Sequence, residues 1–276
     1  MSSALDATAR EARAGTRRRW LDAGTLTPVI AAILFGTYAA LQMRWDWLET
    51  YYPLLLRGLG MTVLLVVVTS SLGMLLAIPI GLVQVVGPKW LALPARAFCT
   101  VIRGTPLLLQ LWLLYYGLGS LFPQFPWIRD SALWPILRQA WPYAFLGLTL
   151  SYAAYEGEVF RGAFKGVPKG QLDAARAYGM SGLLMFRRIW LPQAFKRAMP
   201  TLAGETILQL KATPLVATIT VIDVYSVAAQ VRQQTYLTYE PLLLISAIYI
   251  LMAVVITKVF AWLSGQGQDN TALSKS

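Results

Sequence analysis

Long apolar runs alternate with short polar segments along most of the chain. The hydrocarbon core of a bilayer is about 30 Å thick and takes roughly 20 residues of helix to cross, so each apolar run of about that length predicts a transmembrane helix. We therefore expect an all-α, polytopic membrane helical bundle with six transmembrane helices. The predicted spans cover residues 26–43, 58–86, 104–120, 139–155, 198–222 and 241–257.

Charged residues interrupt this pattern in the fourth and fifth spans. Glu156 and Glu158 lie where the fourth span would continue, and Glu205 and Lys211 lie inside the fifth. An ionised side chain that faces lipid is costly. We therefore expect Glu205 and Lys211 to face protein or a water-filled cavity.

The composition agrees with a membrane protein, because 57% of the residues are hydrophobic and only 13% are charged. The formal net charge of +11 has a topological meaning, since cytoplasmic loops of membrane proteins retain Lys and Arg. With the amino terminus inside, the cytoplasmic side receives five Arg in residues 1–25, Lys89 and Arg96, and eight basic residues in 161–197. Only five fall on the opposite side, so both termini are predicted to be cytoplasmic. No nucleic-acid partner is implied, because that function would favour a compact soluble basic module.

Several kinds of chemistry are disfavoured by what the sequence lacks. Histidine is absent and Cys99 is the single cysteine, so neither an internal disulfide nor a cysteine and histidine metal cluster can form. Histidine is also the commonest general base. With its acids scattered as well, the chain does not resemble a membrane-embedded enzyme.

A basic polar loop, residues 164–199, connects the fourth and fifth spans. Pro168 can open a helix, and Gly179 can close it in the left-handed conformation. Ser181 is expected to cap a second helix that stops near Pro192. The loop is therefore predicted to form a helix, a glycine turn and another helix.

Leu172, Ala175 and Tyr178 share one face of the first helix in this loop. An apolar stripe on a helix at the membrane surface can fill a groove in a partner protein. We expect this stripe to dock on such a partner.

The same loop resembles the cytoplasmic motif of the permease subunits of binding-protein-dependent ABC importers. That motif is Glu-Ala-Ala, three residues, Gly, nine residues, then Ile, any residue, Leu and Pro. Every spacing is kept here, with Asp in place of the first Glu. The matching residues are Asp173, Ala174, Ala175, Gly179, Ile189, Leu191 and Pro192.

Three flanking segments are similar to the polar amino acid branch of that family, which includes histidine, arginine, glutamine and opine permeases. The segments are residues 102–110, 167–171 and 210–215, the last departing at Ala212 and Pro214. The resemblance covers about residues 58–264.

The resemblance implies a type I ABC importer permease in the bacterial inner membrane, with no cofactor and no catalysis of its own. Its implied partners are two ATP-binding cassette subunits that carry ATP and Mg²⁺, a second permease subunit that is identical or homologous, a periplasmic substrate-binding protein and membrane lipid. The chain has no Gly-x-x-x-x-Gly-Lys-Ser/Thr loop for phosphates, so the ATPase must be another polypeptide. The implied ATPase-coupling residues are Gly170, Asp173, Ala174, Ala175, Gly179, Ile189, Leu191 and Pro192.

The expected domain organisation follows from the spans and the resemblance. Residues 1–25 form a cytoplasmic basic tail, and residues 26–57 add a first transmembrane helix and an external loop. The permease domain covers residues 58–264, with the coupling loop at 164–199. Residues 265–276 form a cytoplasmic tail.

Polar residues in or near the spans are candidates for the substrate path. Glu156 either attracts a cationic amino acid or guanidinium compound, or is solvated at the cytoplasmic end of its span, and we favour the solvated interpretation. Glu158 and Arg161 are three residues apart on a helix and can pair, either for stability alone or as part of a gate. The candidate path residues are Arg103, Glu156, Glu158, Gln209, Lys211 and Thr213.

Proline inside a span bends the helix where the backbone is buried or lines water, so Pro106 and Pro214 also have a structural interpretation, as does Arg103.

The function favoured by these features is ATP-driven import of polar amino acids, with cationic amino acids and opines as candidates. The alternative is an ion-coupled secondary transporter of small polar solutes. Such transporters usually contain inverted repeats, and no internal repeat is found in this sequence.

Overall fold

The computed structural model describes residues 30, 36–38 and 42–264, and every regular element in that part of the chain is helical. The chain divides into two compact units, residues 1–49 and 50–276, and the second contains the features described below. The predicted first span, residues 26–43, falls largely outside the described residues, as do the two predicted cytoplasmic tails.

Two helices are each long and apolar enough to cross a membrane on their own. They are α3 (Trp47–Val86) and α14 (Tyr239–Leu263), which contain the predicted spans 58–86 and 241–257. At 1.5 Å per residue, the 40 residues of α3 extend about 60 Å, which is longer than the hydrocarbon core is thick.

The connection after α3, whose Lys89 and Arg96 we counted on the cytoplasmic side, folds as a helix, α4 (Lys89–Gly104). Two of its side chains, Ala92 and Cys99, are buried, and α4 packs against a later helix, α9. A helix with one apolar face can carry charges on its other face, so the two cations are compatible with this helix.

The predicted third span, residues 104–120, is bent. Pro106 precedes the next helix, and the axis turns by 104° between α4 and the helical segments that follow. This bend agrees with the structural role expected for Pro106. The segments are α5 (Leu107–Trp112), the π-helical η2 (Leu113–Leu118), α6 (Gly119–Leu121) and η3 (Phe122–Gln124).

Two short helices, α7 (Pro126–Arg129) and α8 (Trp134–Leu137), lead into α9 (Trp141–Lys165), which extends the predicted fourth span past both of its acids. The coupling loop contains α10 (Lys169–Ala177), α11 (Gly182–Met185) and the π-helical η4 (Phe186–Trp190).

The predicted fifth span begins in α12 (Leu191–Ala212) and continues through a 3₁₀ segment, η5 (Thr213–Ile219). Thr220 then adopts a left-handed conformation, with φ of 68°. The chain bends by 52° into α13 (Val224–Thr235), which Asp223 and Ser226 cap reciprocally.

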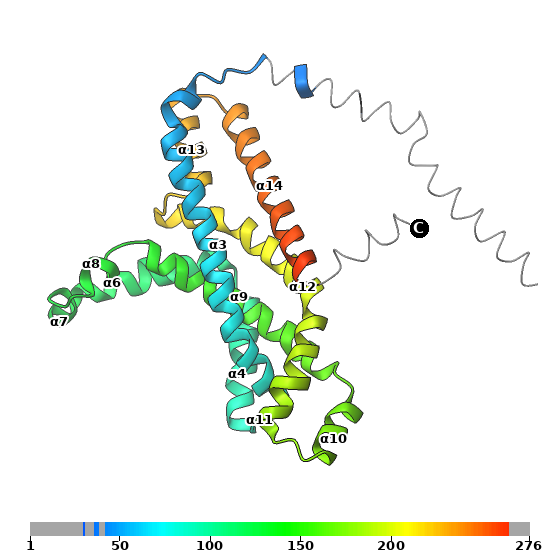
Figure 1. The fold of residues 1–276 in the computed structure, drawn as a ribbon. Helices are drawn as coiled ribbons and strands as arrows, with labels where there is room; N and C mark the ends of the chain where they lie inside the picture. The colour runs from blue at the N-terminus through cyan, green and yellow to red at the C-terminus, as the bar shows by residue number, and fades with distance from the viewer. Residues whose placement is uncertain (1–29, 31–35, 39–41, 265–276) are drawn as a thin grey trace, which may run out of the picture. The chain divides into compact units, whose positions relative to one another are not determined.

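Within the described residues, two helices meet the length and composition of a span, or up to four if each bent pair is counted as one. The prediction of an all-α membrane protein is confirmed, and the number six stays a prediction. In Figure 1 the α10 and α11 segment lies near the turn between α3 and α4, and α13 lies at the opposite end of α3.

Candidate functional site

The coupling loop contains the predicted helix and glycine turn. The first helix, α10, begins directly after Pro168, and Gly179 has a φ of 73°. The backbone N–H of Gly179 donates to the carbonyl of Arg176 at 2.9 Å, and that of Met180 donates to the carbonyl of Ala175 at 3.1 Å. These bonds satisfy carbonyls at the helix end, as glycine-terminated helices commonly do.

The second half of the loop differs from the prediction at its end. Ser181 caps α11 as expected, with its hydroxyl accepting from the N–H of Leu184 at 3.4 Å. The helix does not stop near Pro192, however, because the π-helical η4 carries it directly into α12. Pro192 lies in the first turn of α12, where a proline is compatible with the helix.

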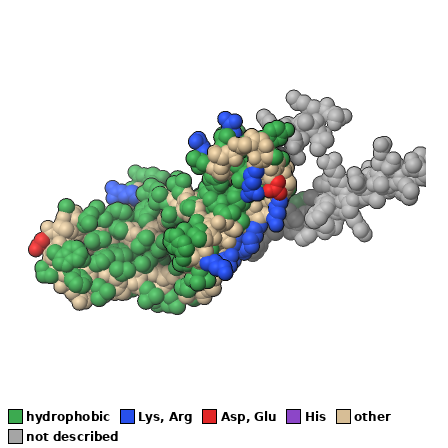
Figure 2. All heavy atoms as spheres, turned by 90° about the horizontal axis from the view of Figure 1, so that it is seen from below, with side chains coloured by type: hydrophobic (Ala, Val, Ile, Leu, Met, Phe, Trp, Pro, Cys, Tyr) green, Lys and Arg blue, Asp and Glu red, His purple; other side chains and the backbone are tan. Residues whose placement is uncertain are grey.

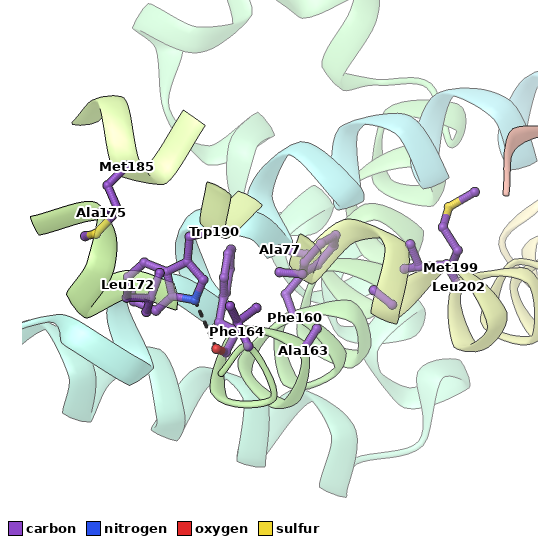
Figure 3. Close-up of a cluster of buried hydrophobic side chains, with 13 residues drawn as sticks. Ala77, Phe160, Ala163, Phe164, Leu172, Ala175, Met185, Trp190, Met199 and Leu202 are labelled. Carbon is purple, nitrogen blue, oxygen red and sulfur yellow. Dashed lines mark hydrogen bonds between the residues drawn. The ribbon is translucent and has the colours of Figure 1, made fainter. Parts of the chain in front are cut away.

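The apolar stripe of α10 mostly faces this chain, which corrects the expectation that all of it docks on a partner. Leu172 and Ala175 are buried in a hydrophobic cluster with Met185 and Trp190, as Figure 3 shows. Tyr178, in contrast, is 87% exposed. The stripe therefore attaches the loop to its own protein and leaves one aromatic ring for contact with another molecule.

A buried hydrogen bond joins the loop to the end of α9. The indole Nε1 of Trp190 donates to the carbonyl oxygen of Phe164 at 3.0 Å, and the two rings meet edge to face at 5.5 Å between centroids (Figure 3). Both side chains are less than a tenth exposed. The hydrogen bond and the ring contact thus attach η4 to the carboxyl-terminal end of α9.

The remaining motif residues divide by exposure. Asp173 is exposed and pairs with Arg176 on the same helix at 2.8 Å. On the face that Figure 2 shows, most of the Lys and Arg side chains gather toward one end, and an acidic side chain lies among them. Among the predicted coupling residues, Gly170, Asp173, Ala174, Gly179 and Pro192 are exposed, Ile189 and Leu191 are half-buried, and Ala175 is buried.

A second candidate site is a cavity of about 180 Å³ between α9 and α12. Its polar walls come from Glu205 and Gln209 on α12 and from Ser151 and Tyr155 on α9. The complete lining is Leu107, Ser151, Tyr152, Tyr155, Glu205, Leu208, Gln209 and Ala212.

Glu156 is fully buried, so our preferred interpretation of it as a solvated end residue was wrong. Neither oxygen of its carboxylate has a hydrogen-bond partner among the described residues. The next residue, Gly157, marks a close approach of other helices to α9, because a Cβ there would lie 2.8 Å from Ile80 of α3 and 3.4 Å from the sulfur of Cys99 on α4.

Glu158 is in a different situation, because two cations lie near it. Arg161 donates to its carboxylate from Nε at 2.8 Å and from Nη2 at 2.6 Å, which confirms the predicted pair. Arg103 approaches the same oxygen at 3.9 Å and lies over the ring of Tyr155. The negative charge of Glu158 is thus offset, whereas no ion pair to Glu156 or Glu205 is found in the part of the chain that the structure describes.

The other path candidates are only partly brought together. Gln209 lines the cavity and is held by bonds to the hydroxyl of Thr69 and the carbonyl of Leu148, at 2.9 and 3.1 Å. Thr213 is buried at the start of η5 and bonds within the protein, and Lys211 is exposed. Neither of these two lines the cavity.

Sequence reasoning assigned no role to Ser151, Tyr152 or Tyr155, all of which line the cavity. Glu205 was expected to face protein or a water-filled cavity, because an acid inside an apolar span is costly in lipid, and it lines this cavity. The hydroxyl-bearing residues give no comparable signal, because such side chains also occur as ordinary buried groups.

Comparisons with known proteins agree with this architecture. The chain is 41% identical over 213 residues to the octopine transport system permease protein of Rhizobium meliloti, covering 77% of this chain and 85% of that protein. It is 37% identical over 188 residues to the arginine ABC transporter permease protein of Haemophilus influenzae, covering 68% and 81%.

Among solved structures, an amino acid ABC transporter crystallised with histidines superposes with a TM-score of 0.66 at 31% identity, covering 81% of this chain and all of that one. A family model described as "Binding-protein-dependent transport system inner membrane component" matches residues 70–265. The chain therefore belongs to the family of inner membrane components of binding-protein-dependent transport systems.

Proposed function

We propose that this chain is the permease subunit of an ATP-driven importer of polar amino acids, and that its substrates are cationic amino acids or opines. Membership of the family supports the transport role. The names of two relatives specify octopine and arginine as transported compounds. Arginine carries a permanently charged guanidinium group, which requires a negative partner when it leaves water.

The negative charge around the small cavity is the observation that carries the substrate class. Glu205 is the one charged residue that lines this cavity, and Glu156 directly follows another lining residue, Tyr155, with neither carboxylate oxygen hydrogen-bonded among the described residues. A carboxylate in a cleft concentrates ligands of the opposite charge. A substrate ammonium or guanidinium group is the cation that would complete this arrangement.

Energy for transport comes from other subunits in this proposal. Two ATP-binding cassette subunits bind ATP and Mg²⁺, and this chain is a non-catalytic conduit. A second permease subunit, identical or homologous, completes the path, and a periplasmic binding protein delivers the substrate. Both chain termini face the cytoplasm, so that the basic tail, the coupling loop and residues 265–276 lie on the ATPase side.

The coupling surface consists of the exposed motif residues of the loop. Gly170, Asp173, Ala174 and Pro192 would contact the ATPase, and Gly179 gives the turn its shape. Buried or half-buried Ala175, Ile189 and Leu191 support this surface from below. The docking contact is proposed to include the exposed ring of Tyr178, since it is the one part of the apolar stripe that remains free of the core.

The test of the substrate site is transport of arginine compared with citrulline, its neutral analogue, in proteoliposomes that contain the complete importer and the binding protein. Glu205→Gln and Glu156→Gln should reduce arginine uptake about ten- to a hundredfold relative to citrulline, because a hydrogen bond to a charged group contributes about 1.5–3 kcal/mol. Glu158→Gln, on the same helix as Glu156, is the comparison variant and should change the ratio less, since the charge of Glu158 is already paired with Arg161.

An unchanged ratio of arginine to citrulline uptake in both variants would exclude the acidic cavity as the selective site. Uptake should also persist on ATP when an ionophore collapses the ion gradients. Loss of uptake under that condition would contradict ATP-driven import.

A further inference from the structure

Two cavities of different character share one wall residue, Tyr152. The first is the acidic cavity of about 180 Å³, which includes Glu205. The second is a groove of about 620 Å³ between α3 and α14, the two most apolar helices among those described. Aliphatic side chains such as Val67, Leu251 and Val255 form most of this groove and are themselves exposed. Tyr152 lines both cavities.

The hydroxyl of Tyr152 is fixed by α12. It lies 2.7 Å from the hydroxyl oxygen of Thr206, which in turn donates to the carbonyl of Leu202 at 2.8 Å. A threonine hydroxyl has one proton to donate, so Tyr152 is the donor in the first bond. Thr206 also lines the groove, and both side chains are buried.

The ring of Tyr152 is held on its other side by the backbone of α3. A Cβ at Gly73 would lie 2.8 Å from Cδ1 and 3.1 Å from Cβ of Tyr152, closer than side chains normally approach. Only a residue without a side chain therefore allows the ring to occupy this position. The ring thus fills the space between α3 and α12.

The acidic cavity lies behind this wall, and Glu205 lines it. Glu156, whose carboxylate oxygens have no hydrogen-bond partner among the described residues, is one helical turn beyond Tyr152. A carboxylate or a charged substrate that came into contact with hydrocarbon would be strongly disfavoured. A closed wall confines both to the cavity.

We propose that Tyr152 is a positioning residue whose ring separates the acidic cavity from the lipid-facing groove. The proposal rests on the proposed function only in taking this cavity as part of the substrate path. A tyrosine that merely packed in the core would stabilise the helices without controlling which molecules reach Glu156 and Glu205 from the membrane.

The experiment measures access from lipid with a hydrophobic carbodiimide, dicyclohexylcarbodiimide. The oxygen of a protonated carboxyl group adds to the central carbon of this reagent while its proton passes to one nitrogen. The acyl group then migrates from this oxygen to a nitrogen, and the stable N-acylurea that results is detected by peptide mass spectrometry. The complete importer is labelled in proteoliposomes without substrate, and labelling of Glu156 and Glu205 is quantified. A water-soluble carbodiimide, applied in parallel, reports access from the aqueous side.

Tyr152→Ala should raise labelling of these acids by the lipid-soluble reagent severalfold, with a smaller change for the water-soluble one. Tyr152→Phe should remain near the wild-type level, because the ring still covers Gly73. The matched control is Leu148→Ala, since Leu148 is fully buried on the same helix and lines neither cavity. Labelling of Glu156 and Glu205 in Leu148→Ala should equal that in the wild type.

Gly73→Ala provides a second variant if Tyr152→Ala fails to assemble, because it displaces the ring and keeps the tyrosine. Gly60→Ala on the same helix is its control, since nothing lies within 4 Å of the added Cβ. Equal lipid-side labelling of wild type, Tyr152→Ala and Gly73→Ala would overturn the proposal, and so would an equal rise in the Leu148→Ala control. Labelling needs no substrate, so its result does not depend on which compound is transported. The role of Tyr152 can therefore be supported even if arginine and citrulline uptake show no effect of the acids, and it can be refuted even if they do.

Discussion

The tight crossing of α3 and α9 at Gly81 makes a quantitative prediction about stability. We compare Gly81→Ala with Gly60→Ala, which lies on the same helix. Gly81 is buried against α9, whereas Gly60 is exposed and has open space where a Cβ would be added. The two variants introduce the same methyl group into the same helix, and only one of them meets a neighbouring backbone.

The magnitude follows from the distances at Gly81. An added Cβ would lie 2.7 Å from Cβ of Phe160, 2.8 Å from the backbone nitrogen of Arg161 and 2.9 Å from the carbonyl oxygen of Gly157. Ordinary contacts begin at 3.4 Å, so the helices must separate by about 0.7 Å, the difference between 3.4 and 2.7. Overpacking of this kind costs about 1–3 kcal/mol.

Alanine is better than glycine in a helix interior by about 1 kcal/mol, and this gain is common to both variants. Gly60→Ala should therefore stabilise the protein slightly, and Gly81→Ala should be less stable than Gly60→Ala by about 1–3 kcal/mol. For a chain of roughly this size, each kcal/mol changes the melting temperature by about 2–4 °C.

The chain contains its own reporter for the measurement. Cys99 is the only cysteine and is 1% exposed, so a thiol-reactive fluorescent dye reacts only when the surrounding helices open. Cys99 lies on α4 beside Gly157, close to the crossing that Gly81→Ala perturbs. Dye fluorescence during heating of the purified protein in detergent gives the melting temperature of each variant.

Equal melting temperatures for Gly81→Ala and Gly60→Ala would refute the reasoning, because they would mean that α3 and α9 do not approach as closely as described. A lower value for Gly60→Ala than for the wild type would contradict the helix-propensity argument as well. The expected order is Gly60→Ala highest, with Gly81→Ala clearly below it.

Two further predictions concern the coupling loop. Trp190→Phe removes the indole donor to the carbonyl of Phe164, which keeps only its long bond from the N–H of Val167 at 3.4 Å. The loop should therefore be destabilised by about 0.5–1.5 kcal/mol, seen as faster trypsin cleavage within the loop of the folded protein. Gly179→Val places a β-branched residue at a φ of 73°, which costs on the order of 1–2 kcal/mol, and should weaken copurification with the ATPase subunits. Gly182→Val is the control for Gly179→Val, since Gly182 has open space around it and no positive φ. Equal loss of copurification in both variants would contradict a role for the turn.

The helix, turn and helix of the coupling loop could be predicted because local signals determine them. Pro168 and Gly179 act through their own backbone preferences, and Ser181 caps a helix within three residues. What covers the apolar stripe could not be predicted in the same way. Leu172 and Ala175 would look alike in sequence whether they faced a partner or this protein, and only the position of Trp190 decides it.

The burial of Glu156 was not predictable because it depends on distant parts of the chain. An acid near the end of a span is solvated if its neighbourhood is open and buried if other helices cover it. Here α3 and α4 approach α9 at Gly157, the residue next to Glu156, and the local sequence gives no signal of either approach.

Helix α9 physically connects the coupling loop to the acidic cavity. Phe164, which accepts the hydrogen bond from Trp190, lies eight residues after Glu156, or about 12 Å along an uninterrupted helix. The same loop continues through η4 into α12, and Glu205 lies on that helix. In the proposed importer, a displacement of the loop by an ATPase would therefore reach two walls of the cavity through α9 and α12. Tyr152 and Thr206 join α9 and α12 by a hydrogen bond beside the cavity. If the two helices move together, this bond is kept during transport, and its loss in Tyr152→Phe should lower uptake. If they move apart, the bond breaks in each cycle, and Tyr152→Phe should not lower uptake.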